Sequence, residues 1–276
     1  GGSPMSNKTR LKVARVPVAR LSRPQVDDMW ELYASYYQNV SRDRFDRDLA
    51  EKDCVFVGVE RRSGRVRAFS TARFYTVRHA GRTVGVYFSG DTMVHPDHWG
   101  GHVLQRRIVP ALLAWRLRRP FRRVYWHLTC NGYRTLLTLA NSFPEYWPHP
   151  DRPLPEWEEA LIDRISREQF GSAWRPEEGV VRDDALLKGG VAPFTPEVRA
   201  IPAVRLFLER NPGYLRGDEL SMIGRVNAGF FLRIACKLLP SSRSGRRPET
   251  RAGGRPSRTS APLSRPGPRV LRREGP

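Results

Sequence analysis

The sequence predicts an α+β fold in which a mixed, mostly antiparallel central sheet is flanked by helices. A helical C-terminal extension and a disordered basic tail are expected to follow it. Two observations lead to this prediction. Runs rich in β-branched and aromatic residues, separated by glycine-containing turns, fill 54–94 and predict three consecutive antiparallel strands. Apolar residues at helical spacing then follow over about 100–119.

The N-terminal half alternates strands and helices. Pro17 restricts the first segment to an edge strand, because proline donates no ladder hydrogen bond, and Ser22 with Pro24 predicts a helix start. Pro110 should kink the helix predicted over 100–119 or delay its start. The last meander strand and the strand after this helix should be adjacent and parallel. The predicted strands cover 11–19, 54–60, 66–77, 83–94 and 123–130, and the helices 25–37, 42–53, 100–119 and 133–141.

The C-terminal half is less regular. One clear helix is predicted over 155–170, and 183–220 shows no assignable pattern. The segment 221–239 is predicted to be a cationic amphipathic helix that packs on the domain or, alternatively, lies on a membrane surface. We therefore expect three parts: an N-terminal core over 6–143, an accessory part over 144–240 that completes the fold, and a tail over 241–276.

Composition excludes several classes of protein. Hydrophobic residues make up 39% of the chain, so wholesale disorder is excluded, and there is no apolar run long enough for a transmembrane helix. Three widely spaced cysteines indicate a reducing compartment and argue against a disulfide or zinc framework. We expect a cytoplasmic protein, with peripheral contact to a membrane as the alternative.

The charge is strongly basic, with 48 Lys and Arg against 28 acidic residues and a net charge of +20. The tail over 241–276 holds ten Arg and two Glu, so it supplies +8 of this total. Such a tail could hold nucleic acid, an anionic membrane or an acidic carrier protein electrostatically. The alternative is an arginine-rich composition without a binding role.

The segment Ser89–His102 is the most informative part of the sequence. A strand ends at Val94, a polar loop with Gly100 and Gly101 follows, and a helix begins. Glycines at this position let backbone N–H groups approach a ligand closely, and a helix N-terminus favours an anion such as pyrophosphate.

The order of elements and the strand exit Val94-His95-Pro96 resemble the GNAT superfamily of N-acyltransferases, over about 11–143. The resemblance implies that backbone groups of Met93 and Val94 pair with the pantetheine arm of an acyl-CoA. The next loop would cradle the pyrophosphate. Its glycine pattern departs from that family, since Trp99 stands where Arg or Gln is expected. The implied cofactor-binding residues are Met93, Val94, Trp99, Gly100, Gly101, His102, Val103 and Asn131.

The resemblance resumes at Asn131-Gly132-Tyr133. It implies that Asn131 contacts the pantetheine arm or the cofactor, and that Tyr133 protonates the leaving thiolate, although Tyr133 comes earlier than the family's tyrosine. Cys130 could instead serve as a nucleophile, but burial in a strand would make this thiol inert.

An attacking amine must lose a proton, so a general base is needed. Asp91 is the first candidate, because it stands near the end of the central strand, and a turn or capping carboxylate is the alternative. His95, followed by His98 and His102, could act instead, or these histidines could simply hydrogen-bond the loop. No carboxylate or cysteine joins them at metal-ligand spacing, so no metal is predicted.

Seven arginines lie on the helix predicted over 100–119 or directly after it, and they could recognise phosphate or form a solvated face. Phosphate recognition would suit CoA or the acyl-phosphopantetheine of an acyl carrier protein, the donor of similar enzymes that make long-chain N-acyl amino acids. Many aromatic residues could line an acyl pocket or pack in the core. The arginines are Arg106, Arg107, Arg116, Arg118, Arg119, Arg122 and Arg123.

The sequence thus predicts an acyltransferase that moves an acyl group from a CoA or carrier-protein thioester to an amine acceptor, either a small molecule or a peptide, by direct attack with general-base assistance. The accessory part over 144–240 is expected to shape the acceptor side. Two alternatives stay open. The chain could be a GNAT-shaped binding module without catalysis, or a basic nucleic-acid-binding protein, although no zinc finger, helix-turn-helix or RNA-recognition signature occurs.

Overall fold

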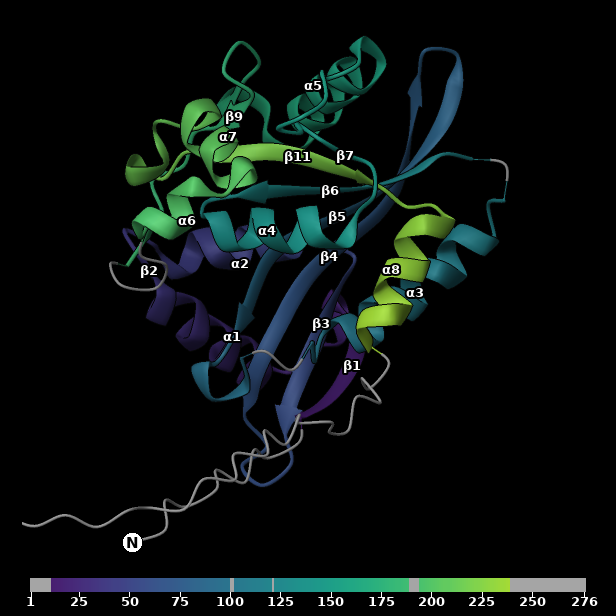
Figure 1. Cartoon of the computed structure of the whole chain (residues 1–276). Helices are drawn as coiled ribbons and strands as arrows, with labels where there is room; N and C mark the ends of the chain where they lie inside the picture. The colour runs from purple at the N-terminus through teal and green to yellow at the C-terminus, as the bar shows by residue number, and fades with distance from the viewer. Residues whose placement is uncertain (1–10, 100–101, 121, 189–193, 239–276) are drawn as a thin grey trace, which may run out of the picture. The chain divides into compact units, whose positions relative to one another are not determined.

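The structure of the chain is a computed structural model, which describes residues 11–99, 102–120, 122–188 and 194–238. The predicted fold class is confirmed: a mixed, mostly antiparallel sheet is flanked by helices on both faces (Figure 1). The predicted tail over 241–276, Gly100 and Gly101 lie outside the described residues.

The strands are β1 (Leu11–Pro17), β2 (Tyr37–Gln38), β3 (Cys54–Glu60), β4 (Val66–His79), β5 (Arg82–Val94), β6 (Val124–Cys130), β7 (Tyr146–Trp147), β8 (Trp174–Arg175), β9 (Val180–Val181), β10 (Leu186–Leu187) and β11 (Glu219–Arg225). The helices are α1 (Arg23–Tyr36), α2 (Arg42–Ala50), α3 (Gln105–Leu117), α4 (Tyr133–Ser142), α5 (Glu156–Phe170), α6 (Pro196–Ala200), α7 (Pro202–Arg210) and α8 (Ala228–Leu238). Most N-terminal elements therefore fall within a few residues of their predicted bounds.

The main sheet has the order β1-β3-β4-β5-β6-β11-β9-β8, and β7 also pairs with β11. Its pairs are antiparallel except for β5 and β6, which are parallel as predicted. This parallel pairing joins only Gly85–Ser89 to Val124–Leu128. Beyond Ser89 and Leu128 the two strands diverge, and Figure 1 shows β5 running steeply across the direction of β6 and β11. The divergence opens the sheet at its centre.

A bulge in β5 lies beside this opening. The register between β4 and β5 shifts at Thr71, so that Gly90 and Asp91 together oppose one residue. A Cβ atom on Gly90 would stand 2.5 Å from Thr71 Oγ1, so glycine is needed for the close approach. The bulge therefore directs Asp91 out of the regular ladder at the point where the strands separate.

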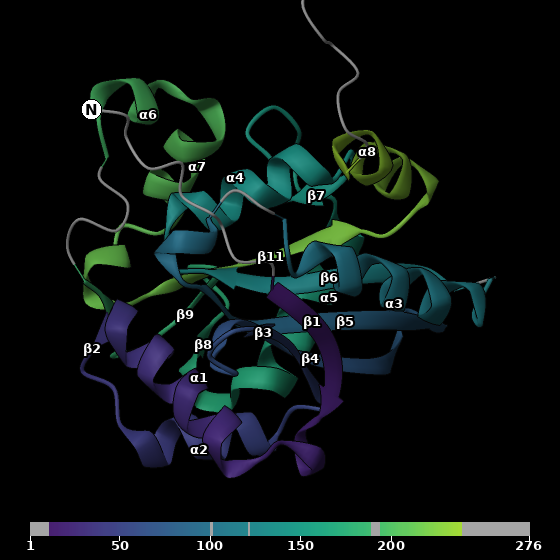
Figure 2. The ribbon, with the colours of Figure 1, turned by 90° about the horizontal axis from the view of Figure 1, so that it is seen from below.

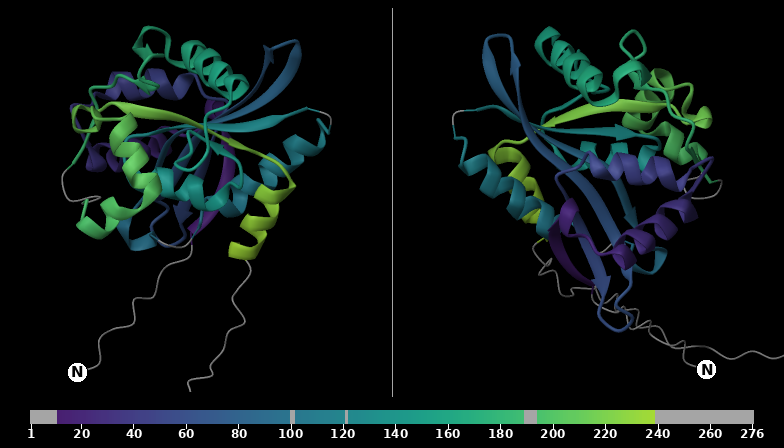
Figure 3. Two further views of the ribbon diagram at one scale, coloured as in Figure 1. Left: turned by 45° about the horizontal axis from the view of Figure 1, so that its top comes forward. Right: turned by 180° about the vertical axis from the view of Figure 1, so that it is seen from behind.

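The two faces of the sheet carry separate cores, because side chains alternate along each strand. In β3, Cys54 and Phe56 pack into the core under α3, α4 and α8, whereas Val55 and Val57 pack on α1 and α2. Helix α5 covers the rest of the second face, beside β6 and β11. Figures 2 and 3 show these two helical layers on either side of the strands.

The prediction of one helix over 221–239 is wrong. Residues Glu219–Arg225 form β11 in the middle of the main sheet, and only Ala228–Leu238 are helical. Ile223 is fully buried between neighbouring strands, and Gly224 is needed because a Cβ there would stand 2.5 Å from Phe143 Cδ1. A strand buried on both faces has no alternation, so its apolar residues were mistaken for a helical stripe.

The start of α1 follows its prediction. The Ser22 hydroxyl accepts from Gln25 N, and the Gln25 side chain accepts from Ser22 N, which together form a capping box. Pro110 lies inside α3. Among the residues that the structure describes, no helix combines the length and apolarity needed to cross a bilayer.

Candidate active site

A cavity of about 660 Å³ lies where β5 and β6 diverge. Its lining includes Tyr33 and Phe45 from the core of α1 and α2, and Leu139 and Phe230 from the core of α4 and α8. Because these cores cover opposite faces of the sheet, the cavity passes between the two strands. It has a polar end and an apolar end, which differ sharply in character.

Four carboxylates line the polar end, here called the acidic end: Asp48, Asp91, Asp183 and Glu219. Two of them are neutralised. Lys52 Nζ lies 2.6 Å from Asp48 Oδ1, and Arg44 lies 2.6 Å from Asp183 Oδ2.

Asp91 and Glu219 have no ion pair with any residue in the described part of the chain. Glu219 instead accepts a hydrogen bond from the Thr129 hydroxyl. The acidic end therefore presents two carboxylates that lack a cationic partner of their own.

Burial changes the proton affinity of both groups. It raises the pKa of Asp91 to about 8, with a further contribution from the negative charge of Asp48 and an opposing one from Lys52. Burial also raises the pKa of Glu219 to about 7, although hydrogen bonds from Thr129 and Asn131 act against it. A carboxyl with a pKa near 8 accepts a proton from an amine far more readily than an ordinary aspartate does.

Two tyrosines stand among these carboxylates. Burial raises the pKa of Tyr33, and the charges of Asp91, Asp183 and Glu219 raise it further. The pKa of Tyr37 is raised by burial and by the same three charges. The carboxylates of β5, β11 and the 183–188 segment thus surround one space beside the aromatic rings.

The acidic end is closed by a small second sheet. Leu186 and Leu187 of β10 pair with Gln38 and Tyr37 of β2, and Lys188 Nζ donates to Ala34 O over 2.7 Å. This contact ties the segment that carries Asp183 to the C-terminal end of α1. The 183–188 segment therefore lies against β2 and α1 on this side of the cavity.

The apolar end, here called the apolar arm, is lined by residues of α3, α4, α8 and their flanks. The apolar side chains among them that are at least nine-tenths buried are Leu104, Ile108, Leu139, Phe143, Phe230 and Ile234. Trp126 of β6 also lines the cavity, and its Nε1 donates to Ser89 Oγ over 2.7 Å. This bond joins β5 to β6 at the last paired residues before they separate.

The free edge of β5 is already engaged within the chain. His95 N donates to Arg67 O, so the backbone groups of Val94 point away from β4 and towards the opening. Val94 O accepts from Trp99 Nε1 at 2.7 Å and from the Tyr36 hydroxyl at 2.8 Å. A pantetheine arm that used this carbonyl would have to displace Trp99.

The loop after β5 contributes several predicted residues. Met93, Val94, Trp99, His98, His102 and Val103 all line the cavity. His102 has a φ of 46°, a left-handed conformation that glycine adopts more readily. His95 is not among the lining residues, and its Nδ1 lies 3.4 Å from Asp97 Oδ2.

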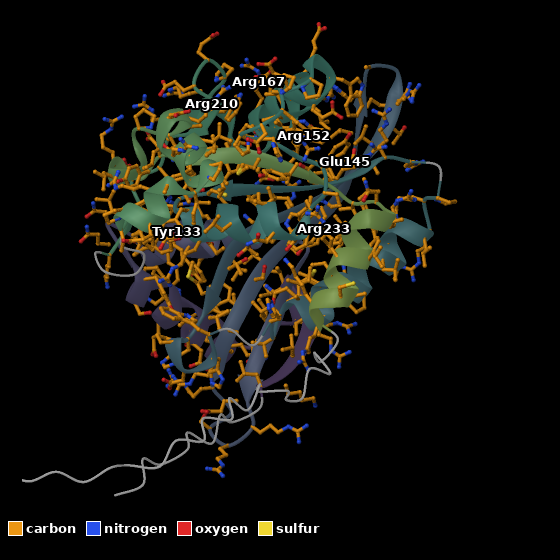
Figure 4. All side chains as sticks on the ribbon, viewed as in Figure 1. Tyr133, Glu145, Arg152, Arg167, Arg210 and Arg233 are labelled. Atoms are coloured by element: carbon orange, nitrogen blue, oxygen red, sulfur yellow. The ribbon has the colours of Figure 1, made fainter. Side chains whose placement is uncertain are left out.

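Asn131 and Tyr133 have different surroundings. Asn131 lines the cavity and is held by long hydrogen bonds to Ala185 O and Gly217 O. Tyr133 is buried at the start of α4, away from the cavity lining, and its ring packs 4.9 Å from Phe194 (Figure 4). The structure thus brings Asp91 and Asn131 to one cavity but leaves Tyr133 outside it.

The predicted arginine cluster is divided. Arg106 lies in the first turn of α3, about 18 Å along the helix from Arg118. Three of the seven donate to backbone carbonyls of the chain itself: Arg107 to Val13 O, Arg116 to Arg119 O and Pro120 O, and Arg119 to Trp115 O. A cation that the sequence analysis missed, Arg134, lines the cavity and lies 5.4 Å from the centre of the Trp99 ring.

Sequence reasoning also missed Asp48, Lys52, Asp183 and Glu219. The spacing of Asp48 and Lys52 was a usable signal, because residues four apart on a helix face each other. Glu219 belongs to the segment without an assignable pattern. Among the described residues, no group of three or more His, Cys, Asp or Glu side chains is arranged to hold a metal ion.

No protein-family model and no curated protein matches the sequence. Solved structures are similar at low identity. They include a GNAT family N-acetyltransferase of Escherichia coli in complex with CoA (14% identity, TM-score 0.37, 58% of this chain and 82% of that chain). Arabidopsis thaliana NAA60 in complex with a bisubstrate analogue is another, with 9% identity and a TM-score of 0.40 over 78% of this chain and 100% of that chain.

A probable N-acyltransferase of Enterococcus faecalis is also similar, with 11% identity and a TM-score of 0.36 over 47% of this chain. The match spans about a third of that protein, 32% of its length. Similarity at such low sequence identity concerns the path of the backbone and not the activity. Any statement about activity has to come from the cavity and the residues that line it.

Proposed function

We propose that the chain is an N-acyltransferase that moves an acyl group from a thioester to a primary amine. The observation that carries this proposal is Asp91, a carboxyl with a raised pKa and no cationic partner among the described residues. It stands at a bulge where β5 and β6 separate into one continuous cavity. The likeness of element order to the GNAT superfamily is consistent with it.

The acceptor would enter at the acidic end. Asp91 and Glu219 attract a cationic amine, and the paired Asp48 and Asp183 add little net charge. Tyr33 and Tyr37 offer aromatic rings to an alkylammonium group. Asp91 and Glu219 are both half-buried, so water screens their charges less than at an open surface and their attraction for a cation is stronger.

The reaction follows from this placement. The Asp91 carboxylate takes a proton from the ammonium group, and the neutral nitrogen then attacks the thioester carbonyl carbon. The carbon–nitrogen bond forms and the carbon–sulfur bond breaks. The second proton of the attacking nitrogen passes to the departing thiolate, and Asp91 returns its own proton to solvent. Asn131 and Trp99 line the same cavity as Asp91.

The donor is an acyl-CoA or the acyl-phosphopantetheine of a carrier protein. Arg134, His98 and His102 stand at the cavity near the loop after β5 and could bind a phosphate of either donor. We favour CoA for the first experiments because it is a defined small molecule.

Release of free thiol from acetyl-CoA in the presence of butylamine at pH 8.5 tests the proposal. We expect amine-dependent release by the wild-type chain and by Asp97→Asn, an exposed carboxylate of the neighbouring loop that serves as the matched control. Asp91→Asn should lose it. Equal rates for Asp91→Asn and the wild type, or no amine-dependent release from acetyl-CoA or octanoyl-CoA, would overturn the proposal.

A further inference from the structure

The apolar arm has no role in the transfer of an acetyl group. Its six side chains carry no hydrogen-bonding atom. The polar side chains that line the cavity from the same helices are Gln105 at the start of α3 and Thr135, Thr138 and Ser142 on α4, and the Thr138 hydroxyl is engaged with Arg134 O. Water is held poorly by apolar walls, because each buried water molecule needs about two to four polar partners. The arm therefore suits an apolar group.

The pantetheine arm of the donor does not meet this requirement. It carries amide groups, and burying an amide without a hydrogen-bond partner is unfavourable. The part of β5 beyond Ser89, which does not pair with β6, lies at the opening, whereas Leu139 and Phe143 line the cavity from α4 and its C-terminal flank. Amides fit the strand edge, and a hydrocarbon fits the arm.

Helix α8 forms the outer wall of the arm and is fixed in place. The rings of Phe143 and Phe230 stack with their centroids 4.4 Å apart. Lys237 Nζ donates to Asn141 O over 2.7 Å, and Arg233 donates to Phe143 O over 3.3 Å. Figures 1 and 2 show α8 beside both α3 and α4, so these three helices enclose the arm together.

From this arrangement we infer that the donor carries an acyl chain several carbons longer than acetyl, and that the apolar arm binds this chain. The inference rests on the proposed function, because it places the thioester at the opening beside Asp91. From that point the arm is the apolar continuation of the same cavity. Its closure by α8 makes the C-terminal extension part of the donor site.

A chain-length series on the full chain tests this directly. The dissociation constants of acetyl-, butyryl-, hexanoyl- and octanoyl-CoA are measured by calorimetry, and the same series is repeated with S-acyl-pantetheines. Each buried methylene should tighten binding about 4-fold until the arm is filled. Equal affinities for acetyl and octanoyl thioesters in both series would overturn the inference.

Matched tryptophan substitutions on α8 locate the chain. Ile234 lines the arm, whereas Leu232 on the same helix is 67% exposed. Ile234→Trp should abolish the preference for octanoyl over acetyl, and Leu232→Trp should keep it. If Ile234→Trp does not fold, as judged by its thermal melt, Leu139→Phe replaces it. A preference that survives the filling of the arm contradicts the inference.

The outcomes separate the two proposals. Chain-length-dependent binding without amine-dependent thiol release would retain the acyl arm and overturn the transferase. Amine-dependent thiol release from acetyl-CoA, with no gain from longer chains, would retain the transferase and overturn the acyl arm.

Discussion

The two ends of the cavity differ in every property that decides what they bind. The acidic end holds Asp91 and Glu219, which have no cationic partner among the described residues and whose pKa values burial raises to about 8 and about 7. The apolar arm holds six buried side chains without a polar atom. One opening between β5 and β6 joins them, so a cation and a hydrocarbon can meet there.

The two ends are also built from different kinds of element. The acidic end depends on short, distant segments: a bulge in β5, the first residue of β11 and the 183–188 segment. The apolar arm depends on regular helices that pack over the sheet. Loss of one carboxylate should therefore affect chemistry, and filling of the arm should affect donor selection.

The largest expected effect belongs to Asp91→Asn. Removal of the general base should lower kcat for acyl transfer to butylamine by about 10²–10⁴-fold. The affinity for octanoyl-CoA, measured by calorimetry, should stay close to that of the wild type. A matching loss of donor affinity would mean that the two ends are not separate in function.

The pH dependence of the rate should follow Asp91. Burial raises its pKa to about 8, so the reactive carboxylate becomes scarcer as the pH falls. The rate at saturating donor should rise roughly tenfold per unit between pH 6 and 7.5 and level off above about 8.5.

Glu219→Gln should shift the rise in rate to lower pH, because the negative charge of Glu219 raises the pKa of Asp91 in the wild type. Asp48 and Asp183 raise this pKa as well, and Lys52 lowers it. A profile with no rise in this range, or one that Glu219→Gln leaves in place, would show that a different group governs the reaction.

The stability of the fold should decrease with rising pH, whereas the rate should increase. Folding raises the pKa of Glu219 from 4.5 to about 7, so the folded state binds its proton more tightly than the unfolded state does. The free energy of unfolding therefore falls as pH rises from about 4.5 to 7, and the loss is complete above that range.

Glu219→Gln should relieve a cost of the order of 1–3 kcal/mol at pH 8 and give no gain at pH 4. Urea unfolding of the wild type and the variant at pH 4 and pH 8 measures this change in the free energy of unfolding. The exposed Glu178, which pairs with Arg182, provides the matched control Glu178→Gln. A gain of equal size at both pH values would contradict the assignment.

The smallest expected effect concerns Trp99. Trp99→Phe keeps an aromatic ring but removes the N–H that binds Val94 O. If the donor needs this carbonyl, its affinity should tighten about 5-fold, the net value of one hydrogen bond. Calorimetry with octanoyl-CoA decides the question, and weaker binding would indicate that Trp99 holds the donor.

The sequence predicted the scaffold better than the site. Strands such as Cys54–Glu60 and Arg82–Val94, and the capped start of α1, follow from local pattern and were found within one or two residues. Strand β11 was missed because a strand buried on both faces lacks alternation.

Asp91 was predicted because it stands near the end of a recognisable strand. Glu219 could not be found in this way, since its place in the cavity depends on the pairing of β11 with β6, a long-range contact. Its partnership with Asp91 also requires the divergence of β5 from β6, which no local pattern specifies.

The central claim is that both ends of the cavity serve one reaction. A crystal structure of the full chain with octanoyl-CoA tests it most directly. We predict that the thioester lies just beyond the last paired residues, Ser89 and Leu128, beside Asp91, and that the alkyl chain fills the arm next to Ile234. A thioester bound away from Asp91, or an alkyl chain outside the arm, would contradict the account.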